Sequence, residues 1–181
     1  MLFRSIKPSN ITSMEVKNIP HLFENTVSRY GDKVLLWEKR GKQYKGTSYK
    51  DARERVRELA AGFLEIGVSK GDRVALISEG RNDWVVSELA LLYIGAISVP
   101  LSVKLDEPGD LIFRINHSGC KGIIVSGNHQ NKVFQILDQF ATVEFVMLLD
   151  KPENGVPDVG SSKKVYVIDD LVEKGDRKST R

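Results

Sequence analysis

Two kinds of hydrophobic spacing alternate along the chain. From Tyr49 to Phe63, apolar residues recur every three or four positions with charged residues between them, which is typical of an amphipathic helix. From Arg73 to Ile77, a short and almost continuous apolar run is typical of a strand buried on both faces of a parallel sheet. Helix-like and strand-like segments then follow each other in turn. The pattern therefore predicts an α/β fold with a mostly parallel sheet and helices on both of its faces.

Polar capping residues, glycines and prolines mark where these elements begin and end. Ser48, with Asp51 three residues later, forms a capping-box pattern at the start of a long helix. Asn82 or Asp83 is expected to cap the next helix, and Asp106 the one after it. The expected helices are 20–31, 48–67, 82–93, 106–119 and 131–140, and the expected central strands are 73–77, 96–103, 122–126, 144–149 and 165–168.

An amino-terminal β-hairpin is expected before this alternation begins. Two extended segments, 34–40 and 43–47, are joined by Gly41 and Lys42. The tip of this hairpin, KRGKQYK, is basic. A solvated edge is the ordinary interpretation of such a tip, and a contact with an anionic lipid or ligand is the alternative.

The two ends of the chain lack periodicity. Residues 1–18 are expected to form an arm, so that the domain itself covers 19–181. Residues 151–164 are rich in Pro, Gly and Ser and predict a loop. The last residues, EKGDRKSTR, are expected to be a polar tail.

Ligands in an open parallel sheet collect outside the carboxyl ends of the strands. Here that edge consists of residues 78–82, 102–106, 126–132 and 150–153. Trp84 lies just after the first of these segments, and we expect it to pack the start of its helix onto the sheet rather than to stack on a ligand. The polar side chains at successive strand ends that together could meet an anionic ligand are Ser102, Lys104, Asn128, His129 and Lys132.

Composition narrows the function classes. Lys and Arg total 27 and Asp and Glu total 24, and the basic residues are scattered, which argues against a nucleic-acid-binding protein. The single cysteine, Cys120, excludes an intramolecular disulfide and fits a reducing compartment. The longest uncharged run, 89–103, is too short to span a bilayer, and no signal-peptide pattern opens the chain. We therefore expect a cytoplasmic protein.

The common catalytic motifs do not occur in this sequence. It has no G-x-x-x-x-G-K-[ST] phosphate loop, no G-x-G-x-x-G after a strand and no G-x-S-x-G nucleophile elbow. His117 and Cys120 are three positions apart, but two ligands are too few for a zinc site. We therefore predict neither catalytic residues nor metal ligands within this chain.

Residues 47–101 carry a family resemblance. They contain Thr-Ser-Tyr before a helix with Leu-Ala-Ala-Gly, then Gly-Val-x-x-Gly-Asp-Arg-Val-Ala-Leu-Ile, and then Gly-Ala-x-x-Val-Pro-Leu after the next helix. In this order and spacing they resemble the amino-terminal part of the AMP-forming acyl-CoA synthetases, within the adenylate-forming superfamily. The segments ISEGRNDW and LLWEKRGKQY resemble the long-chain fatty acid branch. Weaker similarity extends the resemblance to roughly residues 21–150.

The resemblance implies a reaction for a longer parent enzyme. That enzyme would use ATP to convert a fatty acid to an acyl adenylate with release of pyrophosphate, and would then form a thioester with coenzyme A, with magnesium on the phosphates. The family's phosphate loop and later motifs are missing here, so we expect an amino-terminal scaffold fragment that is inactive alone. The resemblance and the strand-end positions together suggest a coenzyme A edge in the parent, formed by Ser102, Lys104, Asn128 and Lys132.

Two other functions remain open at this stage. The parent could be a ligase for shorter acids or one that stops at the acyl adenylate, or the chain could be a free-standing binding module without catalysis. A peripheral membrane contact also stays open. Because strands that are apolar throughout need both faces and edges covered, we expect the isolated chain to self-associate.

Overall fold

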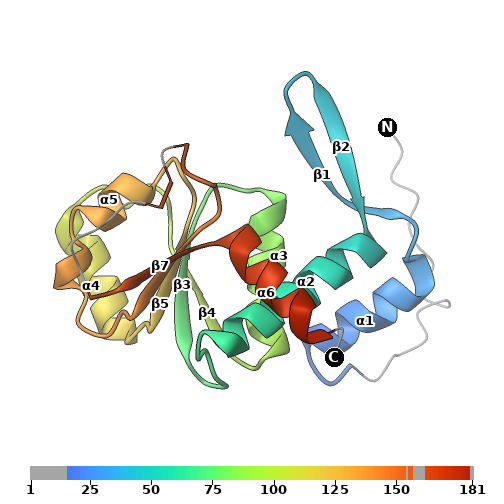
Figure 1. Cartoon of the computed structure of the whole chain (residues 1–181), viewed down its shortest axis with the longest axis horizontal. Helices are drawn as coiled ribbons and strands as arrows, with labels where there is room; N and C mark the ends of the chain where they lie inside the picture. Colours follow the sequence, from blue (N-terminus) through green and yellow to red (C-terminus); the bar gives the residue numbers. More distant parts are fainter. Residues whose placement is uncertain (1–15, 154, 157–161, 180–181) are drawn as a thin grey trace, which may run out of the picture.

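The computed structural model describes residues 16–153, 155–156 and 162–179. Within them a five-stranded parallel sheet has the strand order β4-β3-β5-β6-β7, and β1 and β2 form a separate antiparallel hairpin (Figure 1). The predicted α/β class, the mostly parallel sheet and the amino-terminal hairpin are therefore confirmed. The strands are β1 Val34–Arg40, β2 Gln43–Ser48, β3 Arg73–Ile77, β4 Ile97–Pro100, β5 Gly122–Val125, β6 Phe145–Leu148 and β7 Lys164–Val167.

Helices cover both faces of the five-stranded sheet, with α4 and α5 on one side and α2, α3 and α6 on the other (Figure 1). The helix α1 packs beside α2, away from the sheet. No helix in the described part of the chain is both long and apolar enough to cross a membrane. The helices are α1 Ile19–Tyr30, α2 Tyr49–Glu65, α3 Asn82–Tyr93, α4 Pro108–Ser118, α5 Gln130–Phe134 and α6 Ile168–Ser179, with a 3₁₀ turn at Leu137–Gln139.

Alternate side chains of the central strands fill two separate cores. In β3, Val74 and Leu76 belong to the core that includes α2, α3 and α6. Ala75 and Ile77 belong to the core that includes α4 and α5. All four are fully buried, because successive side chains of a strand point to opposite faces and both faces are covered. The interpretation of 73–77 as a strand buried on both faces is correct.

The carboxyl-terminal segment departs from the prediction. Residues 168–179 form helix α6 rather than ending in a polar tail, and α6 packs against α2 (Figure 1). Leu171 is fully buried there, and Gly62 of α2 and Gly175 of α6 let the two backbones approach closely. A Cβ at Gly175 would overlap the carbonyl oxygen of Glu58. The helix is stabilised by this tertiary contact, which its polar and glycine-containing sequence does not reveal.

Several predicted elements are shorter than expected. The strand expected at 96–103 ends at Pro100, because β3, the only strand beside it among the described residues, ends at Ile77. The helix expected at 131–140 divides into α5 and the 3₁₀ turn. Its apolar side chains, which include Val133 and Phe140, are nevertheless buried as expected.

The predicted helix caps have mixed outcomes. Ser48 caps α2 as predicted, because its Oγ accepts a hydrogen bond from the Asp51 backbone N–H at 3.1 Å. The residue before α3 is Arg81 rather than Asn82 or Asp83, and its side chain makes no capping hydrogen bond. Glu107 rather than Asp106 precedes α4. Of the predicted arm, residues 16–18 are described and residues 1–15 lie outside the described residues.

Candidate functional site

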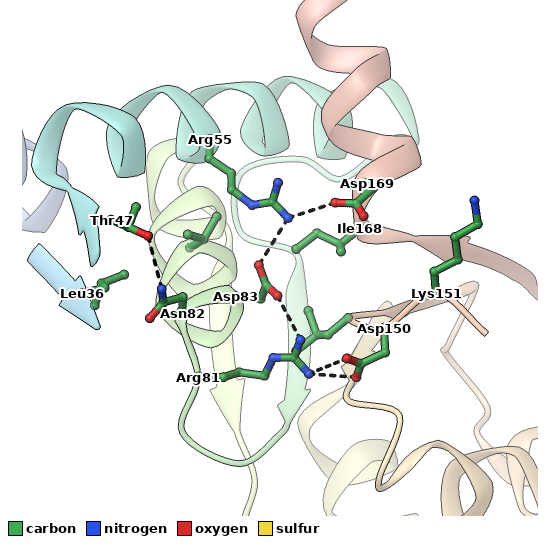
Figure 2. A pocket seen from close by; sticks show the side chains of 12 residues that line it. Leu36, Thr47, Arg55, Arg81, Asn82, Asp83, Asp150, Lys151, Ile168 and Asp169 are labelled. Atoms are coloured by element: carbon green, nitrogen blue, oxygen red, sulfur yellow. Dashed lines mark hydrogen bonds and ion pairs between the residues drawn. The ribbon is translucent and has the colours of Figure 1, made fainter. Parts of the chain in front are cut away.

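A polar cavity of about 390 Å³ opens beside the carboxyl ends of β3 and β6. The strands are parallel, so the loops that follow them meet at one edge of the sheet, as the sequence predicted. The hairpin contributes Leu36 and Thr47 to its wall, and α2 contributes Arg55 (Figure 2). The remaining wall comes from residues 81–83 and Val86 of α3 and its preceding loop, from 149–151 after β6, and from the start of α6.

Five charged side chains form a continuous ion-pair chain along this cavity (Figure 2). Nη1 of Arg81 lies 2.8 Å from both carboxylate oxygens of Asp150, and its Nη2 lies 3.1 Å from Oδ2 of Asp83. Nη2 of Arg55 lies 3.3 Å from Oδ1 of Asp83 and 3.0 Å from Oδ1 of Asp169. The ion-pair chain therefore joins the end of β6 to α3, α2 and α6.

Three groups of the ion-pair chain, Asp150, Arg81 and Arg55, have shifted pKa values. Burial alone would raise the pKa of Asp150, but the backbone N–H of Gly127, which donates to its Oδ2 at 2.7 Å, and Arg81 outweigh burial and lower that pKa. Burial alone would lower the pKa of Arg81, but the carboxylates of Asp150 and Asp83 raise it. The pKa of Arg55 is raised for the same reason by its two aspartate partners.

This arrangement positions elements rather than presenting free charge to a ligand. Both guanidinium groups of the wall are neutralised by aspartates, so they do not form the cluster of unpaired donors that a triphosphate needs. Lys151 is exposed at the rim and makes no ion pair with a described residue. No group of three or more His, Cys, Asp or Glu side chains in the described residues could hold a metal ion.

The four residues of the predicted coenzyme A edge lie outside the wall of this cavity. The Nζ of Lys132 donates to the carbonyl oxygens of Val103 and Leu105 at 2.7 and 3.1 Å, which places it beside the loop that carries Ser102 and Lys104. The Ser102 hydroxyl accepts from the Lys104 backbone N–H at 3.2 Å. These three are thus brought together, while the coenzyme A role itself stays a prediction.

Asn128, the fourth residue, belongs to a different cluster around Glu79. Its Nδ2 donates to Oε1 of Glu79 at 3.1 Å, and the buried Ser126 hydroxyl donates to Oε2 at 2.6 Å. Nε2 of His129 lies 3.6 Å from the same carboxylate. Burial alone would raise the pKa of Glu79, but the Ser126 hydrogen bond and the Arg81 guanidinium group lower it. Glu79 therefore ties the loop after β5 to the loop after β3.

The sequence-based interpretation located the edge but missed the charged residues that organise it. The segments 78–82 and 150–153 contain Arg81 and Asp150, and a charged residue in the loop that follows a buried strand is the signal that could have found them. The hydrogen bond from Arg55 to Asp169 joins residues 114 positions apart, so no local sequence pattern predicts it.

The neighbours of Trp84, His117 and Cys120 indicate packing roles for these three residues. Trp84 is partly buried against the core shared by α2, α3 and α6, as expected for a packing residue. The ring of His117 stacks on Phe113 with the ring centroids 5.3 Å apart. The Cys120 thiol is buried and lies 3.1 Å from the Ser118 hydroxyl, so His117 and Cys120 have different neighbours.

The family of this chain follows from a comparison of its sequence with family models. The sequence model of AMP-binding enzymes matches residues 23–177. The chain belongs to the AMP-binding enzyme family. It is accordingly part of an adenylate-forming enzyme domain, and the parallel sheet with its two helical layers is the portion of that domain described above.

Curated relatives of this AMP-binding chain include ligases for different acids. The long-chain-fatty-acid–CoA ligase ACSBG2 of Xenopus laevis is 25% identical over 144 residues, which cover 78% of this chain and 19% of that protein. The 4-hydroxybutyrate–CoA ligase 2 of Metallosphaera sedula is 27% identical over 155 residues, which cover 80% of this chain and 28% of that protein. The chain thus spans about a fifth to just over a quarter of these relatives' length.

Two solved structures have a similar fold. The A-PCP didomain of carboxylic acid reductase from Segniliparus rugosus, in complex with AMP, gives a TM-score of 0.77 at 18% identity and covers 91% of this chain and 27% of that one. Coronafacic acid ligase from Pectobacterium brasiliense gives a TM-score of 0.71 at 18% identity and covers 83% of this chain and 28% of that one. At such identities the likeness concerns the fold alone.

Proposed function

We propose that this AMP-binding chain is the amino-terminal scaffold of a long-chain fatty acid–CoA ligase. Such a ligase converts ATP, a fatty acid and coenzyme A to acyl-CoA, AMP and pyrophosphate. The observation that carries the proposal is the similarity to ligases named for long-chain acids in Xenopus laevis and, at 22% identity over 166 residues, in Arabidopsis thaliana. The segment ISEGRNDW, with LLWEKRGKQY upstream, supports the same branch.

Within that enzyme, we assign the described residues a positioning role. The five-stranded sheet and the ion-pair chain fix the loops at the carboxyl edge, where Arg81 and Asp150 hold the ends of β3 and β6 together. ATP and magnesium would be held by parts of the enzyme beyond these residues, because no phosphate cradle or metal-ligating cluster is present among the described side chains. Coenzyme A would bind along the edge formed by Ser102, Lys104, Asn128 and Lys132. The enzyme would be cytoplasmic.

A ligase for shorter acids is the second candidate. It is supported by the similarity to the 4-hydroxybutyrate–CoA ligase 2 of Metallosphaera sedula, whose identity to this chain is 27%. The two candidates share a scaffold and differ in the acyl-binding tunnel, so they predict different acid preferences for the same polypeptide.

The decisive experiment is ATP–pyrophosphate exchange with a panel of acids from four to eighteen carbons on the polypeptide that contains this chain and its continuation. We expect exchange to be strongest with long-chain acids. A preference for short hydroxy acids would support the second candidate, and a reading frame that ends with this chain would favour a non-catalytic binding module.

The same assay on the 181-residue chain alone gives a further prediction. We expect no fatty-acid-dependent exchange above the buffer control, because both arginines of the cavity wall are already paired with aspartates. Measurable exchange by the isolated chain would contradict the scaffold role.

A further inference from the structure

The β1–β2 hairpin has one face on which large apolar side chains are exposed. Trp37 and Tyr44 are 62% and 68% exposed, and Val34 is 42% exposed. Trp37 and Lys39 are two positions apart in β1, and Lys39 pairs with Tyr44 across the hairpin, so these three share a face. A Cβ at Gly46 would touch the side chains of both Val34 and Trp37. The exposed hairpin face therefore consists of Val34, Trp37, Lys39 and Tyr44.

The tip beside this face is strongly basic. Residues 39–45, KRGKQYK, contain four basic residues and no acidic one, although the whole chain carries a net charge of only +3. Lys39, Lys42 and Lys45 are exposed. The hairpin is a sheet of its own and projects from the body formed by the five-stranded sheet and the helices, so its tip can reach a flat surface (Figure 1).

This combination matches the chemistry of a lipid headgroup layer. Tryptophan and tyrosine favour the boundary between water and hydrocarbon, and clustered lysine and arginine are attracted to anionic lipids. A strand edge that only faces water would explain the charged residues of the hairpin. It would not explain why the rings of Trp37 and Tyr44 are more than half exposed. Nucleic-acid binding proteins usually spread basic residues over a larger patch than one hairpin tip.

We propose that the β1–β2 hairpin docks on the surface of an anionic lipid bilayer, with Trp37 and Tyr44 at headgroup depth and the tip lysines over the lipid phosphates. Docking itself does not depend on the proposed ligase activity. Its consequence does: a hairpin on the bilayer would bring a long-chain ligase to the phase in which its acyl substrate dissolves.

Vesicle binding of the whole 181-residue chain tests the docking without any enzymatic readout. We expect the chain to sediment with phosphatidylcholine vesicles that contain about a third phosphatidylserine, and to remain in solution with phosphatidylcholine alone. Binding should weaken as the ionic strength rises from about 0.01 M to about 0.15 M, because the Debye length shortens. Equal binding to both vesicle types, or none, would overturn the proposal.

Two sets of variants with the same change in net charge locate the contact. Lys39→Glu, Lys42→Glu and Lys45→Glu together should reduce the partition coefficient at least about tenfold. The matched control reverses three exposed lysines elsewhere and should change it less than about threefold. An equal loss in both sets would mean that overall charge, not the hairpin, governs binding. The control substitutions are Lys17→Glu, Lys50→Glu and Lys164→Glu.

Tryptophan emission reports on the hairpin directly. The chain has two tryptophans, so Trp84→Phe leaves Trp37 as the sole one. Its emission should shift to the blue when anionic vesicles are added and should be quenched by brominated lipids. A blue shift that appears without vesicles as the protein concentration rises would assign the face to a second copy. Tighter binding to a single-stranded oligonucleotide than to vesicles would assign it to nucleic acid, and either result would overturn the lipid proposal.

Discussion

Single glycines set the distance between helices α2 and α6. Replacement of Gly175 by Ala would place a Cβ against the carbonyl oxygen of Glu58 and force the helices apart. We expect Gly175→Ala to lower the free energy of unfolding by about 1 to 3 kcal/mol, the usual cost of overpacking. Gly109 is also helical but has open space around it, so Gly109→Ala should leave stability unchanged or raise it by up to about 1 kcal/mol. Equal effects in urea unfolding would contradict the close approach.

The carboxylate of Asp150 makes stability depend on pH. Its pKa in the folded state is lowered, so between the folded and unfolded pKa values the unfolded chain binds more protons and stability rises with pH. The contribution is therefore present above the unfolded pKa of about 3.9 and is lost as the pH falls through the folded pKa. In chemical unfolding, Asp150→Asn should be less stable than the original chain at neutral pH, and this difference should shrink in acid. A difference that is constant down to strongly acidic pH would contradict the charged role of Asp150.

At the scale of elements, the start of α2 depends on one hydroxyl. The Ser48 Oγ accepts from the Asp51 N–H and donates to its carboxylate at 2.7 Å. Ser48→Ala should lower the free energy of unfolding by about 1 kcal/mol, whereas Ser48→Thr keeps the hydroxyl and should retain most of the stability. Thermal melting followed by circular dichroism measures both, and an equal loss in the two variants would argue against the cap.

The ion-pair chain connects four elements through the guanidinium groups of Arg81 and Arg55. Arg81→Met would leave Asp83 and Asp150 without their shared partner, so we expect a loss of about 1 to 3 kcal/mol in the free energy of unfolding. Arg57→Met removes the half-exposed ion pair with Glu24 and should cost less than about 1 kcal/mol. Urea titrations of the two variants compare the sites, and similar losses would mean that the ion-pair chain adds no more than an ordinary surface pair.

The contrast between α2 and α6 shows which elements a sequence can predict. The apolar stripe of α2 and the Ser48 cap at its start are local patterns, and both are found in the structure. The sequence of α6 is polar and contains Gly175, which is unfavourable in an isolated helix, and its stability comes from packing on α2. The ion-pair chain escaped prediction for the same reason, because its members meet only after the sheet and helices have assembled.

At the scale of the whole molecule, the two edge strands of the five-stranded sheet determine whether the protein self-associates. Among the described strands, β4 pairs only with β3, and β7 pairs only with β6. Unpaired backbone groups at such edges recruit other chains, so we expect the isolated protein to self-associate. Light scattering over a wide concentration range should show a mass that rises with concentration. A constant monomer mass, with no binding of a dye specific for apolar surfaces, would show that the edges are sufficiently protected.

The contact between α2 and α6 can form only late, because α6 is synthesised long after α2. The partners Arg55 and Asp169 lie 114 residues apart in the sequence. Ribosomes add about 5 to 20 residues per second, so Asp169 is synthesised roughly 6 to 23 seconds after Arg55. Throughout that interval the glycine-lined face of α2 has no helix against it, while the strands of the sheet emerge one after another. The nascent chain is therefore exposed to chaperone capture or misassembly through α2 until residues 168–179 have left the ribosome and formed α6.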